Sequence, residues 1–139
     1  MADPVQPSNV AVAVATSALK AEQSRMRVIA ENLANADSTS PNHGGDPYRR
    51  QVPVFQPQTV AGAKGVAMTH VVADASQFGS EYAPGHPAAD AQGYVKLPNV
   101  NPILEAIDMR NAQRAYQANL SVIETAREMD TATLCILKK

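Results

Sequence analysis

The chain has 139 residues, the length of one domain, and carries a formal net charge of −1 with a pI near 6.3. This charge balance argues against binding to DNA or RNA, which requires a basic surface. Hydrophobic residues make up 45% of the chain, but aromatic residues only 4%, and tryptophan is absent. Because much of the apolar content is alanine, one copy buries little apolar area per residue, and we expect it to be weakly stabilised.

Targeting signals are absent from the sequence pattern. No run of about 18 apolar residues predicts a membrane span. Met1–Ser8 is polar, and Val10–Ala15 lacks the basic flank and the length of a cleaved signal peptide. Taken alone, these features predict a soluble cytoplasmic protein, unless export uses a signal that is not cleaved.

Glycine and proline are confined to the middle of the chain. Every glycine lies between Gly44 and Gly93, and the prolines avoid Ser8–Ser40 and Ile103–Lys139. Since these residues interrupt helices most strongly, their distribution predicts two long terminal helices around an irregular centre. The predicted fold is mainly α with a small β element, in which the N- and C-terminal helices pack as a coiled-coil-like pair. The predicted regions are 1–36 (N-terminal helix), 37–98 (loop-rich segment with short strands) and 99–139 (C-terminal helix).

The first predicted helix runs from about Ser8 or Asn9, either of which could be its N-cap, to about Ala36. Apolar residues recur every seven positions along one stripe, which predicts that another helix packs against it. We expect Asn35 to end the helix in a left-handed cap, and Asp37, Ser38 and Ser40 to bond local backbone. The stripe comprises Val12, Leu19, Met26 and Leu33, with Ala15, Ile29 and Ala36 between them and Glu22 as its one interruption.

The second predicted helix starts with Asn101 as N-cap and Pro102 at its first position. Lys138 and Lys139 suit the dipole at its C-terminal end. Its apolar face is wider than a strict two-helix seam, because Tyr116 and Ile123 flank the main stripe. That stripe comprises Ala112, Ala115, Asn119, Val122, Ala126, Met129, Thr133 and Ile136.

Strand signals between the helices are short. Val52–Phe55 contains a proline and is an edge strand at best. Gly65–Asp74 is the strongest candidate, and Gly93–Pro98 is a third. Three such strands make a small β element and not a catalytic domain.

No motif predicts catalysis, a cofactor or a metal. His43 and His86 lie in loops near Asp46 and Asp90, but their spacing matches no metal signature. Cys135, the one cysteine, excludes an intrachain disulfide and is predicted to be a buried small hydrophobe. No phosphate-binding glycine loop, nucleophile elbow or zincin motif occurs. We therefore expect a protein that is not an enzyme.

Two interpretations of the helical stripes are open. In one, the two stripes pack only on each other within a single chain. In the other, the wide face of the second helix leaves surface for further subunits, and the pattern favours this assembly. The pair Arg49–Arg50 in the turn-rich loop either contacts a partner or faces water.

Several motifs resemble one family. The stretch Asn32–Ser38, NLANADS, is similar to the N-terminal signature of the flagellar rod and hook axial proteins, and Ala112–Leu120, AQRAYQANL, to their C-terminal signature. The middle of the chain resembles the proximal-rod subunits in particular, through GGDPYRRQVPVFQ, GVAMTHVVADASQF and YAPGHPAADAQGYVKLPNVNP.

The resemblance implies a structural subunit that polymerises with copies of itself and with other proximal and distal rod proteins. Together they form a hollow shaft that crosses the periplasm and transmits torque from motor to hook. It implies export without a cleaved signal, through the flagellar type III apparatus, and terminal helices in the inner wall of the rod. The residues expected at subunit interfaces are Leu19, Met26, Ile29, Asn32, Leu33, Asn35 and Asp37, then Arg49 and Arg50, and Ala112, Ala115, Tyr116, Asn119, Val122, Ile123 and Met129.

Two alternatives remain open. The chain could be another axial rod subunit of the same family. It could instead belong to a different class, as a cytoplasmic helical adaptor or export chaperone, which its near-neutral charge and lack of a signal would suit.

Overall fold

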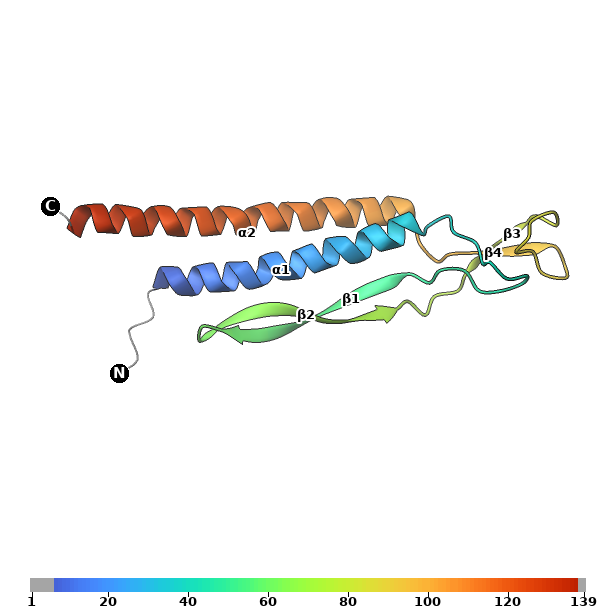
Figure 1. The fold of residues 1–139 in the computed structure, drawn as a ribbon, viewed down its shortest axis with the longest axis horizontal. Coiled ribbons are helices and arrows are strands. Elements are labelled where there is room, and N and C mark those ends of the chain that lie inside the picture. Colours follow the sequence, from blue (N-terminus) through green and yellow to red (C-terminus); the bar gives the residue numbers. More distant parts are fainter. Residues whose placement is uncertain (1–6, 138–139) are drawn as a thin grey trace. The chain divides into compact units, whose positions relative to one another are not determined.

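The computed structural model describes residues 7–137, and this part of the chain is mainly helical with a small β element, as predicted (Figure 1). The elements in chain order are α1 (Pro7–Ala34), β1 (Gln51–Val60), β2 (Ala63–Ala73), β3 (Gly79–Tyr82), β4 (Tyr94–Leu97) and α2 (Pro102–Leu137). Lys138 and Lys139, expected to suit the dipole of the second helix, lie outside the described residues.

The helix ends agree with the sequence to within about two residues, but both predicted caps of α1 are wrong. α1 begins at Pro7, so Ser8 and Asn9 lie inside the helix and neither is its N-cap. α2 begins at Pro102, and Asn101 Oδ1 accepts hydrogen bonds from the amides of Ile103 at 3.0 Å and Leu104 at 3.4 Å. Within residues 7–137, positive φ outside glycine occurs at Ala61 and not at Asn35, so the predicted left-handed cap of α1 is wrong. Instead the side chain of Asn35 donates to the carbonyl of Glu31 at 2.8 Å. This closes the last turn without a left-handed residue.

The serines after α1 make the local bonds that the sequence predicted. Ser38 Oγ donates to the carbonyl of Asn35 at 2.9 Å, and Ser40 Oγ accepts from the amide of Asn42 at 3.1 Å. These short-range bonds compete with further helical bonds, so the chain leaves the helix in a series of turns.

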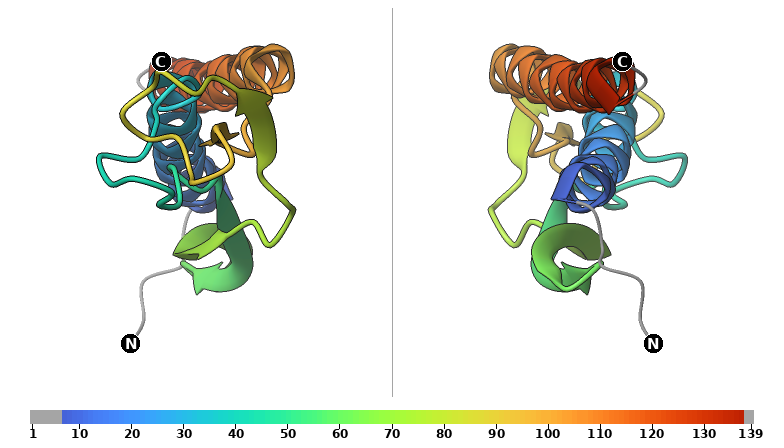
Figure 2. Two further views of the ribbon diagram at one scale, coloured as in Figure 1. Left: turned by 90° about the vertical axis from the view of Figure 1, so that its right-hand side faces the viewer. Right: turned by 90° about the vertical axis from the view of Figure 1, so that its left-hand side faces the viewer.

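The strands form two separate hairpins. β1 pairs with β2, and β3 pairs antiparallel with β4 from Gly79↔Leu97 to Tyr82↔Tyr94. β1 and β2 are longer than predicted, β4 lies where predicted, and β3 was missed. The link Ala61–Gly62 has φ values of 50° and 80°, which are typical of a two-residue turn whose twist suits a hairpin. Prolines 53 and 57 are tolerated in β1 because both strands of a two-stranded sheet are edge strands (Figure 2).

The chain divides into two compact units that each combine distant segments. Unit 1 comprises Met1–Met26, Val54–His70 and Arg110–Lys139, and unit 2 comprises Arg27–Pro53 and Val71–Met109. The three-part division of the sequence at residues 36 and 98 stays a prediction. Unit 1 therefore holds the first part of α1 and the last part of α2, and unit 2 holds the end of α1 and the start of α2.

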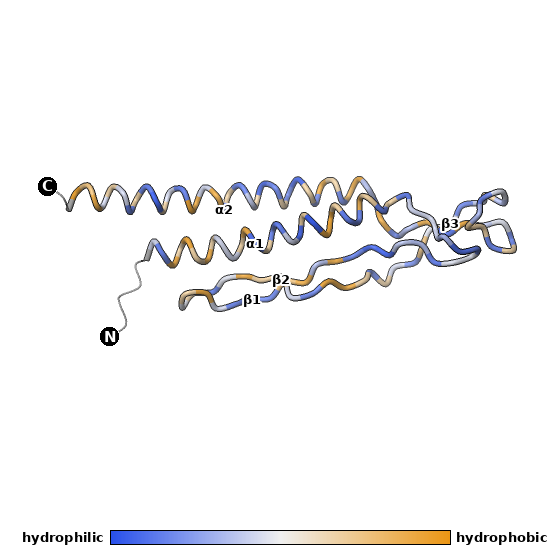
Figure 3. Tube along the Cα trace, in the orientation of Figure 1, coloured by the Kyte–Doolittle hydropathy of each residue, from blue (hydrophilic) through white to orange (hydrophobic). Residues whose placement is uncertain are grey.

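Most of the buried hydrophobic side chains within residues 7–137 are alanines. In unit 1 the buried hydrophobic residues are Ala15, Ala21, Ala112, Ile123 and Ala126, and in unit 2 they are Val28, Ile29, Ala88, Ala89 and Val95. Hydrophobic and hydrophilic positions alternate along both helices (Figure 3). In keeping with that alternation, no helix within residues 7–137 is long and apolar enough to cross a membrane.

Candidate functional site

A cluster of polar side chains lies in unit 2, where the end of α1, the start of β1, the end of β2 and the start of α2 meet. Asn32 of α1 and Glu105 of α2 are each only 1% exposed, which is unusual for an amide and a carboxylate. Burial of such groups is tolerable only where each is hydrogen-bonded. We call this set, Asn32, Tyr48, Arg50, Gln51, Asp74, Asn99 and Glu105, the polar junction.

Asn32 uses its whole hydrogen-bonding capacity. Its Nδ2 donates to the carbonyl of Gln51 at 2.8 Å, and its Oδ1 accepts from the amide of Gln51 at 2.8 Å. The side chain thus pairs with strand β1 as a neighbouring backbone would. Nδ2 also donates to Glu105 Oε2 at 3.2 Å, and Oδ1 accepts from the hydroxyl of Tyr48 at 3.0 Å. These four hydrogen bonds explain why an asparagine occupies the first position of the NLAN motif.

Arg50 neutralises the buried carboxylate. Its Nε donates to Glu105 Oε1 at 2.6 Å, and its Nη1 lies 3.5 Å from Asp74 Oδ2. Nη2 lies 3.9 Å from Asp108 Oδ2. Burial by itself would lower the pKa of Arg50, but the hydrogen bond and charge of Glu105, with the charge of Asp74, outweigh it and raise the pKa. The guanidinium therefore stays charged and holds β1, the end of β2 and α2 together.

The turn after β2 is tied to the same cluster. Asn99 Oδ1 accepts from the amide of Arg50 at 2.8 Å, and its Nδ2 donates to Ser76 Oγ at 2.8 Å. Arg49 Nη1 donates to the carbonyls of Asp74 at 2.9 Å and Ser76 at 3.0 Å, and its guanidinium lies 4.1 Å from the ring centre of Phe78. Both arginines of the predicted pair therefore bind within their own chain. Their role at a subunit interface stays a prediction.

Asp74 should make unit 2 sensitive to acid. Hydrogen bonds from the amide and the hydroxyl of Ser76, together with the charge of Arg50, hold the pKa of Asp74 below its usual value. A carboxylate whose pKa is depressed in the folded state adds stability above its unfolded pKa of about 3.9, and that stability is lost as pH falls through the folded value. We expect urea unfolding at pH 7 and pH 3 to show a smaller acid-induced shift in Asp74→Asn than in the unchanged chain. An equal shift in both proteins would exclude Asp74 as a source of acid sensitivity.

Unit 1 carries an apolar groove between its two helices. The groove has a volume of about 310 Å³ and is lined by Ala11 of α1 and by Ser121, Val122, Thr125, Ala126 and Met129 of α2. Ala112, Ile123 and Ala126 on one side of α2 are at most 8% exposed. The neighbouring side is open, with Val122 46% and Met129 64% exposed. We call the exposed positions Ala118, Val122, Thr125 and Met129 the outer stripe; their alternating spacing of four and three is typical of a coiled-coil seam.

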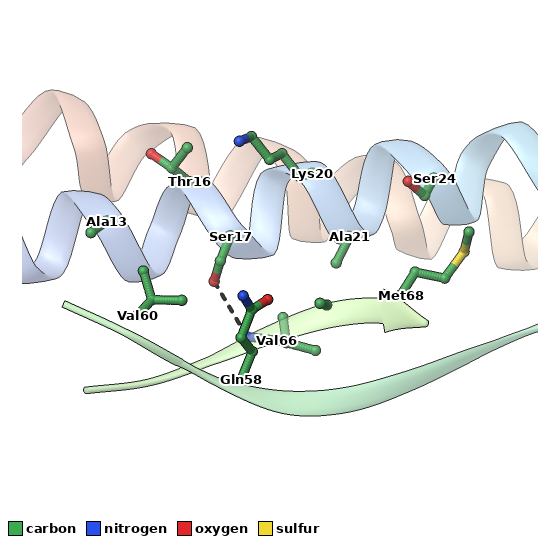
Figure 4. A pocket seen from close by; sticks show the side chains of 11 residues that line it. Ala13, Thr16, Ser17, Lys20, Ala21, Ser24, Gln58, Val60, Val66 and Met68 are labelled. Carbon is green, nitrogen blue, oxygen red and sulfur yellow. Dashed lines mark hydrogen bonds between the residues drawn. The ribbon is translucent and has the colours of Figure 1, made fainter. Parts of the chain in front are cut away.

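A second groove in unit 1 separates α1 from the β1–β2 hairpin (Figure 4). It has a volume of about 480 Å³, and Ser17 bridges it by accepting a hydrogen bond from the amide of Val66 at 3.3 Å. A Cβ atom at Gly65 would lie 2.6 Å from Ser17 Oγ, so glycine permits this close approach. The small side chains Ala13 and Ala21 of α1 also face the hairpin (Figure 4). The β1–β2 hairpin therefore covers a side of α1 that its seven-residue apolar pattern does not predict to be buried.

The residues predicted for subunit interfaces occupy different environments. Those buried within the chain are Ile29, Asn32, Ala112 and Ile123; those partly exposed are Leu19, Met26, Asn35, Arg49, Arg50, Ala115, Tyr116 and Asn119; and those exposed are Leu33, Asp37, Val122 and Met129. The structure brings Asn32 and Arg50 together through Glu105 in unit 2. Val122 and Met129 lie together in the groove of unit 1.

Sequence reasoning missed most of the polar junction. Glu105 was not singled out because an acidic residue in the first turn of a helix usually stabilises the helix dipole at the surface. Gln51 participates chiefly through its backbone, which leaves no sequence signal. The one available signal was the asparagine pair of NLAN, since Asn32 lies on the apolar side of its helix.

The loop histidines and the cysteine do not form a site. Among residues 7–137, no three histidine, cysteine, aspartate or glutamate side chains are close enough to hold a metal ion. Asp46 accepts a 2.6 Å bond from Lys96, and His86 Nδ1 accepts from the amide of Ala88. The predicted burial of Cys135 is wrong, because the residue is exposed near the end of α2.

Comparisons with known proteins identify the class. The family model described as "Flagella basal body rod protein" matches residues 13–40, and the model described as "Flagellar basal body rod FlgEFG protein C-terminal" matches residues 91–134. These segments include most of α1 and of α2. Two long terminal helices with these matches define a structural subunit of the flagellar basal-body rod.

Curated relatives narrow the class to one family. The chain is 42% identical to the flagellar basal-body rod protein FlgC of Agrobacterium fabrum over 136 residues, which is 96% of this chain and 98% of that protein. It is 43% identical to FlgC of Salmonella typhimurium over 88% of this chain and 92% of that protein. It is 37% identical to FlgC of Borreliella burgdorferi over 90% of this chain and 94% of that protein. The chain therefore belongs to the FlgC family of flagellar basal-body rod proteins.

Proposed function

We propose that the chain polymerises with copies of itself and with other proximal and distal rod proteins into a hollow shaft that transmits torque from the motor to the hook. Family membership supports the rod, and the outer stripe of α2 supports the mode of assembly. One copy leaves Val122 and Met129 about half or more exposed at coiled-coil spacing. Burying such side chains against a neighbouring helix is favourable at about 25 cal/mol per Å².

The sixteen predicted interface residues divide into two roles in this proposal. Exposed residues of α2, chiefly Val122 and Met129, contact a neighbouring subunit directly. Buried residues such as Asn32 and Ala112 shape the chain that presents those contacts. Repetition of a head-to-tail contact that does not close generates a helical filament, which is the geometry that a rod requires.

The polar junction supports a mechanical role. Because a buried ion pair with hydrogen-bonded partners has one favourable geometry, it fixes how the end of α1 and the start of α2 meet within unit 2. A subunit that carries torque needs such a fixed connection. In the proposal, the helices bear the load between subunits, and the junction holds each chain in a single conformation.

The resemblance to the family supports the remaining parts of the proposal. The chain reaches the rod in the periplasm through the flagellar type III export apparatus, without a cleaved signal peptide. It acts by packing and not as an enzyme, and it binds no cofactor or nucleic acid. A cytoplasmic adaptor or export chaperone would instead remain in the cytosol and be absent from purified basal bodies.

A photo-crosslinking amino acid at Met129 tests the proposal in cells that lack the native copy. Because Met129 is 64% exposed in one chain, its replacement should covalently capture another rod subunit in purified basal bodies. The matched control is the same replacement at Glu124, an exposed position on the opposite side of α2. Equal capture at both positions, or absence of the chain from basal bodies, would contradict the proposal.

A further inference from the structure

An exposed aliphatic patch lies at the start of α2. Ile103 is 72%, Leu104 57% and Ile107 49% exposed, within little more than one helical turn. Single exposed aliphatic residues are ordinary, but three contiguous ones mark an interaction surface. We call these three residues the start patch. They belong to unit 2, whereas the outer stripe belongs to unit 1.

The start patch adjoins a charged hollow. Leu104 and Ile107 line a pocket of about 320 Å³ together with Arg50, Asp74, Glu105 and the asparagines 99 and 101. Three carboxylates of this pocket, those of Glu105, Asp74 and Asp108, share the one guanidinium of Arg50. Glu105 Oε1 lies 2.6 Å from Arg50 Nε, whereas Asp74 Oδ2 lies 3.5 Å from Arg50 Nη1. The side chain of Asp74 is also 29% exposed. Negative charge is therefore left on the open side of the pocket, so the surface suits a partner with aliphatic side chains and a cation.

The C-terminal end of the same helix has the complementary chemistry. Leu134 is 62% and Ile136 76% exposed, and Lys138 and Lys139 follow them in the sequence. The described part of α2 thus ends with exposed aliphatic side chains, and two lysines follow in the sequence, whereas exposed aliphatic side chains and carboxylates stand at its start.

We propose that the C-terminal end of α2 of one copy docks on the start patch of a second copy, with its lysines toward the Asp74 side of the pocket. The proposal rests on the proposed function, since it supplies a head-to-tail contact between subunits of the rod. Leu134 and Ile136 cover the start patch, and the lysines meet carboxylates at a partly desolvated rim. Charge pairs of this kind fix register and orientation more than they add affinity.

Cys135 provides a direct probe, because it is exposed between Leu134 and Ile136 and is the only cysteine of the chain. Ile103→Cys adds a second cysteine in the start patch. The two positions lie almost nine turns apart in one helix, roughly 48 Å at 1.5 Å per residue. A disulfide needs Cα atoms within about 7 Å, so any bond between them joins two copies. Mild oxidation of basal bodies containing Ile103→Cys should convert at least half of the chain into disulfide-linked dimers and longer oligomers, because each copy then carries a cysteine near both ends of α2.

Three controls define the result. Ile103→Cys combined with Cys135→Ala, and the unchanged chain with Cys135 alone, should each give at least tenfold less dimer. Gln92→Cys places a cysteine at an exposed position outside the patch and should also give at least tenfold less. Lys138→Glu with Lys139→Glu, added to Ile103→Cys, should lower the dimer yield at least fivefold.

The outcomes separate this contact from the proposed function. Normal rods without a dimer would overturn the docking and leave the lateral contact at Met129 untouched. Disulfide capture of a different rod protein by the cysteine of Ile103→Cys would show that a relative, and not a second copy, covers the patch, and would also overturn it. Should Ile103→Cys fail to enter rods, Ile107→Cys replaces it. If neither enters, oxidation of the purified chain at millimolar concentration gives the answer, and absence of the dimer there counts against the docking.

Discussion

Replacing Arg50 by alanine is expected to lower the free energy of unfolding of unit 2 by about 3 kcal/mol. The substitution leaves the carboxylate of Glu105, which is 1% exposed, with the 3.2 Å hydrogen bond from Asn32 but without its ion pair. Removing one member of a buried ion pair typically costs about 3–5 kcal/mol, and the lower value applies because Arg50 is 26% exposed and water can replace part of it. The measurement is urea unfolding followed by tyrosine fluorescence, since Tyr48, Tyr82 and Tyr94 all lie in unit 2.

Two further variants show whether the loss comes from the stranded charge. Arg110→Ala removes an exposed arginine from α2 and should change stability by less than about 0.5 kcal/mol. The double variant Arg50→Met with Glu105→Leu replaces the pair by apolar side chains and should recover much of the stability, because no charge is then left buried. If Arg50→Ala cost less than about 1 kcal/mol, the junction would not be the main restraint on unit 2.

Placing glutamate at Val122 and Met129 together is expected to reduce incorporation of the chain into rods at least 100-fold and to abolish swimming in soft agar. Both positions are largely exposed in one copy, so the isolated chain should keep its helicity in far-ultraviolet circular dichroism. In the assembled rod the same carboxylates would be buried without partners, at a cost of several kcal/mol for each contact. Since about 1.4 kcal/mol corresponds to a factor of ten, two such contacts suffice for the loss.

The matched control is Gln113→Glu with Gln117→Glu. These exposed positions lie on the opposite side of α2 and receive the same change of charge. This variant should assemble and swim normally. Equal loss in both variants would trace the defect to net charge or export, and normal swimming of the Val122 and Met129 variant would remove the outer stripe from the assembly.

The helices were predictable because their signal is local. Glycine and proline act on the backbone of their own neighbourhood, so their exclusion from the ends located both helices, and Pro102 marked the start of the second. β3 was missed because Gly79–Tyr82 has neither β-branched residues nor a regular alternation. This strand forms because β4 lies opposite it, and that pairing is a tertiary property.

The candidate site was predictable only in part, because its contacts also join residues that are distant in the sequence. The seven-residue pattern drew attention to Val122 and Met129, which the structure leaves open, and to Ala112 and Ile123, which it buries. The pattern alone could not divide the two sets, because alanine and valine suit either environment. Arg50 and Glu105 are far apart in the sequence, and no local feature of either residue predicts that they form an ion pair. A salt bridge of this kind becomes visible only when the fold brings its members together.

The polar junction also dictates an order of events for any process that delivers the chain from its N-terminus. Asn32 and Arg50 emerge early, but their shared carboxylate, Glu105, emerges only after most of the chain has passed. Until then Asp74 is the one carboxylate of the polar junction that can pair with the arginine, and the hydrogen bonds that join the end of α1 to the start of α2 cannot form. A hydrogen-bond network between residues so far apart in the sequence therefore forms only after both ends of unit 2 have been delivered.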